Sequence, residues 1–250
     1  MRRIYQLVPY LGPADAIGNF VLALTRWLVG AGFEVVVVAD RSSPDTGLSV
    51  ISPTSFASLV RPEDIVILHL CSCGEVNRAA RAATGPLILY YHNITPPHFY
   101  LDHHAATVGC LRQARQDLRR LAGLTTRTRA IVSSEFSRHE LDALGYDVVG
   151  SVPPAFTFQK LQTHRGSSGA RAARLAYARE GVLTWLSVGR LAPNKRFDAV
   201  IRAFAYYHLR IQPGSQLLLV GHSEDNPMAR TRLERLAQDL GVAEAVTFTG

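Results

Sequence analysis

The sequence has few cysteines. Three occur among 250 residues, which is too few for a fold built on disulfides. Cys71 and Cys73 are separated by one residue, a poor spacing for a structural zinc pair. We therefore expect the cysteines to be free or buried thiols in a reducing compartment.

Long apolar segments are missing as well. Gln6 and Pro9 interrupt the apolar run at the N-terminus, so this run lacks the core of a signal peptide. No stretch is long and apolar enough to span a bilayer. These absences predict a cytoplasmic protein, and peripheral attachment to the inner face of a membrane stays open as an alternative.

Aromatic residues are scarce, at 8% of the chain, and they do not interleave with basic residues as in a base-stacking surface. Nucleic acid is therefore not an expected partner. The 47% of hydrophobic residues is enough for a folded core, and a chain of this length can form one large domain or two ordinary ones. A net charge of +7 favours anionic ligands such as nucleotides or an anionic membrane surface.

Strand and helix patterns alternate along the first part of the chain. Strands are predicted at residues 4–8, 34–39, 65–68, 86–91, 130–133 and 148–152, and helices at residues 19–29, 75–83, 101–121 and 137–144. This alternation predicts an α/β fold with a doubly wound parallel sheet. The first predicted loop, residues 9–18, holds Gly12 and Gly18, whose spacing does not form the glycine-rich fingerprint of dinucleotide sites.

The composition changes after residue 158. Residues 159–181 form a basic connector, with a helix predicted from about residue 170 to 179. Residues 1–158 then form a first domain, and residues 182–250 form a second one with strands at 184–188, 216–220 and 245–248. These elements are too few to close a doubly wound domain. We therefore expect a fragment that lacks roughly 100 or more residues.

The stretch of residues 184–204 is predicted to bind an anion. A buried strand, Thr184–Val188, leads through Gly189 and Arg190 to Lys195 and then to an amphipathic helix, whose apolar face carries Phe197, Val200, Ile201 and Phe204. Free N–H groups at the start of the helix and two cations favour a phosphate or diphosphate at this turn. The alternative is a surface loop that is basic without a ligand.

His92 follows the predicted strand at residues 86–91, and Pro96 and Pro97 prevent a helix directly after it. The carboxyl edge of an open α/β sheet is where ligands bind, so His92 is a candidate site residue. The alternative is a strand-end histidine bonded to nearby backbone. His69, at the end of another predicted strand, is a weaker candidate.

The helix predicted at residues 101–121 has two faces. Its apolar side chains are expected to point inward, and a basic stripe is expected on the outer face. This stripe is either a solvated face or a contact with anionic lipid or acceptor. The apolar set is Ala105, Val108, Leu111, Leu118 and Leu121, and the stripe is Arg112, Arg115 and Arg119.

Four segments resemble family 4 glycosyltransferases in the order of that family. They are residues 91–96 (YHNITP), residues 133–137 (SSEFS), residues 185–195 (WLSVGRLAPNK), and residues 217–221 with 246–250 (LLLVG and VTFTG). The HNITP segment is most similar to bacterial members that build surface polysaccharides. The resemblance implies a GT-B architecture of two Rossmann-like domains, the second incomplete here, with acceptor on the first and nucleotide sugar on the second.

The resemblance also implies roles for individual residues. Arg190 and Lys195 match the basic pair that holds the donor diphosphate, and Gly18 matches a glycine loop near the donor phosphate or acceptor. His92 matches the histidine beside the donor sugar and is the catalytic candidate. Weaker donor-binding candidates are Gly189, Gly221 and Gly250. A retaining transfer is implied, with a nucleotide sugar as co-substrate and no metal or other cofactor required.

The sequence departs from the family pattern in two places. Lys195 is usually followed by glycine, and here Arg196 follows it. The pair of glutamates late in the C-terminal domain is absent, so the donor cannot be identified, and we expect these 250 residues alone to be inactive.

These observations lead to three hypotheses. The first is a transferase that moves a hexose from a nucleotide sugar to a lipid-linked or polysaccharide acceptor in cell-surface glycan synthesis. The second is a catalytically silent binding module that docks on a membrane or a partner enzyme. The third is an epimerase of the same architecture.

Overall fold

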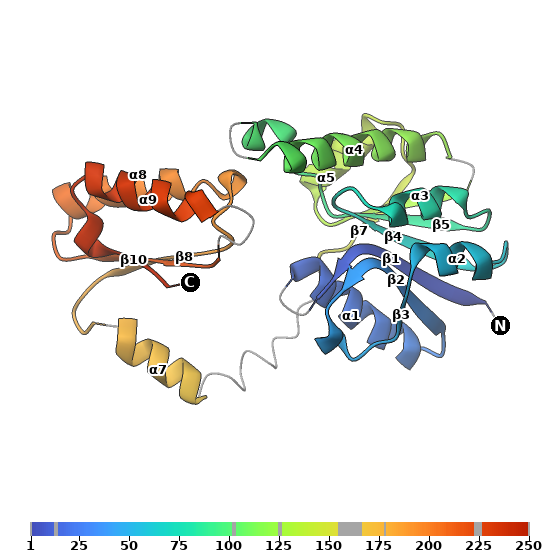
Figure 1. Cartoon of the computed structure of the whole chain (residues 1–250), viewed down its shortest axis with the longest axis horizontal. Coiled ribbons are helices and arrows are strands. Elements are labelled where there is room, and N and C mark those ends of the chain that lie inside the picture. The colour runs from blue at the N-terminus through green and yellow to red at the C-terminus, as the bar shows by residue number, and fades with distance from the viewer. Residues whose placement is uncertain are drawn as a thin grey trace. The chain divides into compact units, whose positions relative to one another are not determined.

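The computed structural model describes residues 2–12, 15–101, 104–124, 127–154, 167–177, 179–222 and 227–249. The chain divides into two compact units. The first comprises Met1–Pro97 and Ala106–Thr157, and the second comprises His98–Ala105 and Phe158–Gly250. Each unit is built on its own parallel sheet (Figure 1).

The described residues of the first unit form a seven-stranded sheet in the order β3-β2-β1-β4-β5-β6-β7, and every neighbouring pair is parallel. The chain moves outward from β1 in one direction and then returns to add β4 on the other side, as the predicted doubly wound sheet requires. The strands are β1 (Arg3–Leu11), β2 (Glu34–Ser42), β3 (Val50–Ile51), β4 (Ile65–Leu70), β5 (Leu87–Tyr91), β6 (Thr128–Val132) and β7 (Val148–Ser151).

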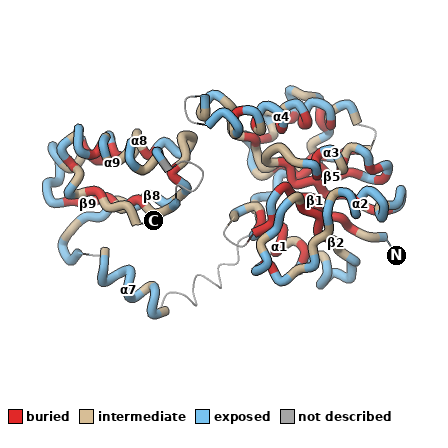
Figure 2. Tube along the Cα trace, in the orientation of Figure 1, coloured by how far each residue is buried: buried red, intermediate tan, exposed pale blue. Residues whose placement is uncertain are grey.

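Helices cover both faces of this sheet. Helix α1 (Ala16–Gly30) lies on one face, and α3 (Glu75–Ala82) and α4 (Ala105–Ala122) lie on the other (Figure 1). Buried residues are concentrated on the central strands (Figure 2). The remaining elements are α2 (Pro53–Leu59), α5 (Glu135–Asp142) and the 3-10 turn η1 (Pro44–Thr46). A further 3-10 turn, η2 (Pro97–Tyr100), follows β5, and all but its first residue belong to the second unit.

The first loop is shorter than predicted. Strand β1 continues to Leu11 and α1 begins at Ala16, so the loop expected over residues 9–18 is wrong at both ends. The helix starts early because the Asp15 carboxylate caps it, accepting a hydrogen bond of 2.8 Å from the Gly18 N–H. Gly18 therefore lies in the first turn of α1, and a Cβ there would lie 2.3 Å from the Gly12 carbonyl oxygen.

Two further expectations for this unit are corrected. Cys73 and Cys110 form a disulfide, because the loop after β4 passes beside α4, and Cys71 is the free cysteine. On α4, Ala105 is exposed. Arg115 is half-buried in an ion pair with Glu140 and does not belong to an outer basic face.

The described residues of the second unit form a three-stranded parallel sheet in the order β10-β9-β8. Its strands are β8 (Thr184–Val188), β9 (Gln216–Val220) and β10 (Val246–Phe248). Helices α8 (Phe197–Arg210) and α9 (Pro227–Asp239) lie on one face (Figure 1). Between helices and sheet lies an apolar core that includes Ile201, Phe204, Leu217, Leu219 and Ala237. The other elements are α7 (Ser168–Tyr177), η3 (Pro193–Lys195) and η4 (Ala243–Ala245).

The strand β8 has the predicted bounds, but the prediction that it is buried is wrong. Leu186 is 63% exposed and Val188 is 70% exposed. Both point away from the face that α8 and α9 cover, and β8 stands at the edge of the sheet. The predicted inward face of α8 is confirmed, since Phe197, Ile201 and Phe204 are buried.

The helix predicted at about residues 170–179 corresponds to α7. The first part of the predicted connector, residues 159–166, lies outside the described residues. Within the described chain, no helix has the length and apolar character needed to cross a bilayer.

Candidate functional site

The loop between β8 and α8 carries the basic residues predicted to hold an anion. It follows the carboxyl end of a parallel strand, the edge where α/β sheets bind ligands. Arg190 and Lys195 both lie on it and both are exposed. The Asn194 side chain between them accepts a hydrogen bond of 3.1 Å from the Tyr100 hydroxyl, which also belongs to the second unit. The loop thus presents two cations on a short, tethered segment.

Two glycines fix the path of this loop. Gly189 has φ 159° and Gly221, directly after β9, has φ 147°. A Cβ on Gly221 would lie 1.9 Å from the Gly189 carbonyl oxygen, so only glycine permits the two backbones to approach this closely. The Leu191 N–H donates to the His222 carbonyl at 2.9 Å and holds the two segments together.

Arg196 occupies a position where family 4 glycosyltransferases usually have glycine, and its backbone conformation explains the preference for glycine. It is left-handed, with φ 52° and ψ 42°, a conformation that glycine adopts at little cost. The Arg196 guanidinium makes two hydrogen bonds of 2.9 Å to the Asp198 carboxylate. This ion pair holds the pKa of the Asp198 carboxyl below its usual range. Arg196 is thus engaged with its own helix terminus.

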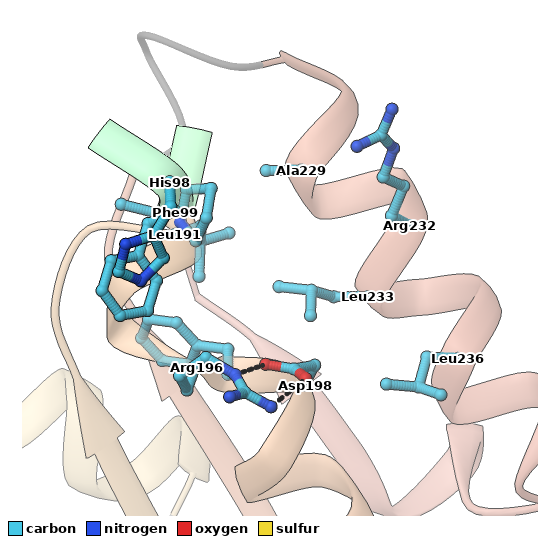
Figure 3. A pocket seen from close by; sticks show the side chains of 12 residues that line it. His98, Phe99, Leu191, Arg196, Asp198, Ala229, Arg232, Leu233 and Leu236 are labelled. Carbon is cyan, nitrogen blue, oxygen red and sulfur yellow. Dashed lines mark hydrogen bonds and ion pairs between the residues drawn. The ribbon is translucent and has the colours of Figure 1, made fainter. Parts of the chain in front are cut away.

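A cavity of about 430 Å³ lies beside this loop within the second unit. Figure 3 shows His98 and Phe99 next to Leu191, across from Leu233 and Leu236 of α9. The Arg196–Asp198 pair lies at its lower edge in this view. Neither Arg190 nor Lys195 lines the cavity, so it is distinct from the surface that carries the two cations.

In the first unit, a row of polar side chains crosses three adjacent strands, from the middle of β1 to the carboxyl ends of β4 and β5. His92 follows β5, His69 lies in β4 and Gln6 lies in β1. His92 Nε2 is 3.0 Å from His69 Nδ1, and His69 Nε2 is 3.0 Å from Gln6 Oε1. The Gln6 amide donates to Thr25 Oγ1 of α1 at 2.7 Å. His69 and Gln6 are fully buried.

The two histidines are neutral in this environment. Burial lowers the pKa of His92 from 6.5 to about 4. Burial, together with the neighbouring His92, lowers the pKa of His69 well below its usual value. Tyr90 stacks on the His92 ring with a centroid distance of 4.5 Å, and Phe20 packs edge-on against both histidines. A neutral imidazole that is held in place can serve as a directional hydrogen-bond partner.

The loop after His92 is held by a second polar network. Tyr91 donates from its hydroxyl to Glu140 at 2.5 Å and accepts from the Ile94 N–H at 3.1 Å. Arg115 donates to the Ile94 carbonyl at 3.0 Å and to Glu140 at 2.7 Å. Both backbone groups of Ile94 are therefore satisfied by side chains. This network fixes the segment that carries His92.

The structure thus assigns the predicted residues to two separate local sites. Arg190, Lys195, Gly189 and Gly221 gather in the second unit, and Gly250 lies outside the described residues. His92 and Gly18 lie in the first unit, where the Gly18 N–H is already bonded to Asp15. The described residues contain no group of three or more His, Cys, Asp or Glu side chains that could hold a metal ion.

Gln6 and Thr25 were not predicted as parts of a site, and Arg115 was predicted only as part of the basic stripe on the helix at residues 101–121. Gln6 gave one signal, since it is a polar residue within an otherwise apolar strand pattern. Thr25 gave none, and the contact of Arg115 with Ile94 gave none, because both depend on elements distant in the sequence.

Comparison with known proteins supports the resemblance. Residues 177–250 match the family described as Glycosyl transferases group 1. D-inositol 3-phosphate glycosyltransferase from Acidothermus cellulolyticus is 29% identical over 286 aligned positions, covering 96% of this chain and 62% of the relative. The chain therefore spans less than two thirds of that relative's length. The predicted similarity to glycosyltransferases is confirmed.

Solved structures agree on the fold. The structure of Anabaena Alr3699/HepE in complex with UDP and glucose matches with a TM-score of 0.73 and 14% identity, covering 100% of this chain and 69% of that one. A glycosyltransferase from Rickettsia africae matches with a TM-score of 0.69 and 13% identity, covering 100% and 68%. The GT-B-like α/β class predicted from the sequence is confirmed.

Proposed function

We propose that this chain, which has a GT-B-like fold and carries a group 1 glycosyl transferase segment, is part of a glycosyltransferase. It moves a hexose from a nucleotide sugar to a lipid-linked or polysaccharide acceptor in the synthesis of a cell-surface glycan. The observation that carries this proposal is the loop with Arg190 and Lys195, which lies inside the matched segment and after a parallel strand.

The loop is suited to a diphosphate. Two cations near a helix start attract phosphate oxygens, and they oppose the charge that develops on a leaving diphosphate. Anabaena Alr3699/HepE has been solved in complex with UDP and glucose and in complex with UDP-glucose, and the fold it shares with this chain supports a donor of the same class. In this proposal Gly189 and Gly221 shape the loop, and its charges neutralise the leaving group without a metal.

The first unit takes the acceptor in this proposal. His92 keeps its predicted role beside the donor sugar. The network of neutral hydrogen-bonding groups that it belongs to is suited to sugar hydroxyls rather than to charged groups. The retaining outcome, the cell-surface acceptor and a cytoplasmic location at the inner membrane face complete the proposal. The retaining outcome and the acceptor are implied by the sequence resemblance, and the location is the one predicted from the lack of a signal-peptide core and of a membrane-spanning stretch.

A transfer assay tests this function. The protein extended to full family length is incubated with radiolabelled nucleotide sugars and a bacterial lipid extract, with and without EDTA, and products are separated by chromatography. Label in the lipid fraction, unaffected by EDTA, is expected, and its anomeric configuration reports retention. Interconversion of the nucleotide sugar alone would instead indicate an epimerase. Nucleotide-sugar binding without any product, in the chain and in a version extended to full family length, would contradict the transferase proposal.

A further inference from the structure

The row of side chains from Thr25 to His92 has a defined direction. Its starting point is the Val21 carbonyl oxygen in α1, which lies 2.8 Å from Thr25 Oγ1. A carbonyl only accepts, and two oxygens this close need a proton between them. The single hydroxyl proton of Thr25 is therefore used toward Val21.

Because the Thr25 hydroxyl donates to Val21, the donor and acceptor of each following hydrogen bond are fixed as well. Thr25 Oγ1 can only accept from Gln6, so the Gln6 NH2 group faces Thr25 and the Gln6 carbonyl faces His69. His69 must then donate from Nε2, which leaves its Nδ1 without a proton. His92 in turn donates from Nε2 to His69 Nδ1. Within the described residues, the Nδ1 of His92 has no hydrogen-bond partner and is left as an acceptor.

The surrounding packing limits the alternative orientations of the histidine rings. His69 and Gln6 are both 0% exposed, so bulk water does not replace a lost partner. Phe20 lies 5.8 Å from the His69 ring and 5.7 Å from the His92 ring, centroid to centroid, and Tyr90 stacks on His92. A ring flip of either histidine would leave a buried donor or acceptor without a partner.

We propose that His69 is a positioning residue that holds His92 in the tautomer with its proton on Nε2, so that Nδ1 presents a hydrogen-bond acceptor. This inference rests on the proposed function, in which His92 binds a sugar hydroxyl, and it adds that His92 Nδ1 accepts the hydrogen bond. The opposite tautomer would present a donor at the same place, so the sugar hydroxyl could no longer donate its hydrogen to His92. His69 acts only through His92.

Two substitutions at His69 separate its two contacts. His69→Asn can keep an acceptor near the position of Nδ1, facing His92. His69→Gln can keep a polar group near the position of Nε2, facing Gln6. In the protein extended to full family length, we expect the His69→Asn variant to exceed the His69→Gln variant in kcat by at least tenfold, with a smaller difference in KM for the nucleotide sugar. Equal kcat values in the two variants would overturn the proposal.

Histidine tautomers are read directly by long-range ¹H–¹⁵N NMR on ¹⁵N-histidine-labelled protein, with His92 assigned by its loss in a His92→Asn variant. The expected result is a single Nε2–H tautomer of His92 in the wild type, and a mixture in the His69→Gln variant. Thr25→Val, which is nearly isosteric and three hydrogen bonds away, should also give a mixture. A fixed Nδ1–H tautomer in the wild type, or no change in either variant, would overturn the proposal.

The NMR readout does not depend on catalysis. Absence of sugar transfer by the wild-type protein extended to full family length would contradict the proposed function, and the tautomer of His92 would still decide the role of His69. If His69→Asn fails to fold, Thr25→Val provides the same test from outside the histidine pair.

Discussion

The buried histidine pair makes the stability of the first unit depend on pH. The folded-state pKa of His92 is depressed from 6.5 to about 4, so the unfolded chain takes up a proton at a higher pH than the native chain does. The free energy of unfolding therefore falls as the pH drops from about 6.5 toward 4. Between pH 7 and pH 5, His92 alone accounts for about 2 kcal/mol, and His69 acts in the same direction.

Hydrogen–deuterium exchange of peptides from β4 and β5 measures this effect within the first unit, once intrinsic exchange rates are corrected for pH. Protection should be lower at pH 5 than at pH 7, and the difference should shrink in a His92→Asn variant. Equal protection at both values would show that the histidines are not held neutral.

Arg196 allows a second test at the level of one residue. Its left-handed backbone costs about 1 kcal/mol for a residue with a Cβ, and the exposed ion pair with Asp198 offsets little of this. Arg196→Gly should therefore be more stable than Arg196→Ala by about 1 kcal/mol. Urea unfolding followed by Trp185 fluorescence, in a Trp27→Phe background, reports the second unit. The account fails here if the alanine variant is the more stable one.

At the scale of elements, the contact between Gly221 and Gly189 positions the basic loop. Gly221→Ala places a Cβ against the Gly189 carbonyl and should destabilise the second unit by about 2–4 kcal/mol. Gly241→Ala is the matched control, because Gly241 also has a positive φ, 71°, but has no atom within 4 Å of the added Cβ. Urea unfolding followed by Trp185 fluorescence compares the stability of the two variants. Equal losses would mean that the close approach of the two backbones is unimportant.

The disulfide links two elements of the first unit. Cys73 and Cys110 are 37 residues apart, and closing a loop of this length stabilises a fold by about 3–4 kcal/mol. Thiol titration of the denatured, unreduced chain should find one reactive thiol, Cys71, and reduction should lower the melting temperature. Cys71→Ser should melt like the wild type. Three reactive thiols in the unreduced chain would contradict the structure.

The sequence predicts elements well where the pattern is local. The bounds of β8 and β9 are as predicted, and so is the buried face of α8, because apolar runs and a helical repeat report directly on these segments. Features that depend on long-range packing were wrong or missed. Leu186 is apolar yet exposed, Arg115 is charged yet partly buried, and Cys73 finds a partner 37 residues away.

In the candidate site, too, residues in local motifs could be predicted and contacts between distant elements could not. Arg190, Lys195 and His92 could be predicted, because each follows a recognisable strand and lies in a motif. The path from Thr25 to His92 could not, because it crosses one helix and three strands whose order is set only by the folded sheet.

At the scale of the whole molecule, the central claim is that the second unit binds the diphosphate of a nucleotide sugar. Isothermal titration of the full chain with UDP and other nucleoside diphosphates tests it most directly. Arg190→Ala and Lys195→Ala should each weaken binding by about 10–100-fold, the value of one charge-assisted hydrogen bond. Arg202→Ala, which removes an exposed arginine of α8, should bind as the wild type does. Unchanged affinity in both loop variants would contradict the account.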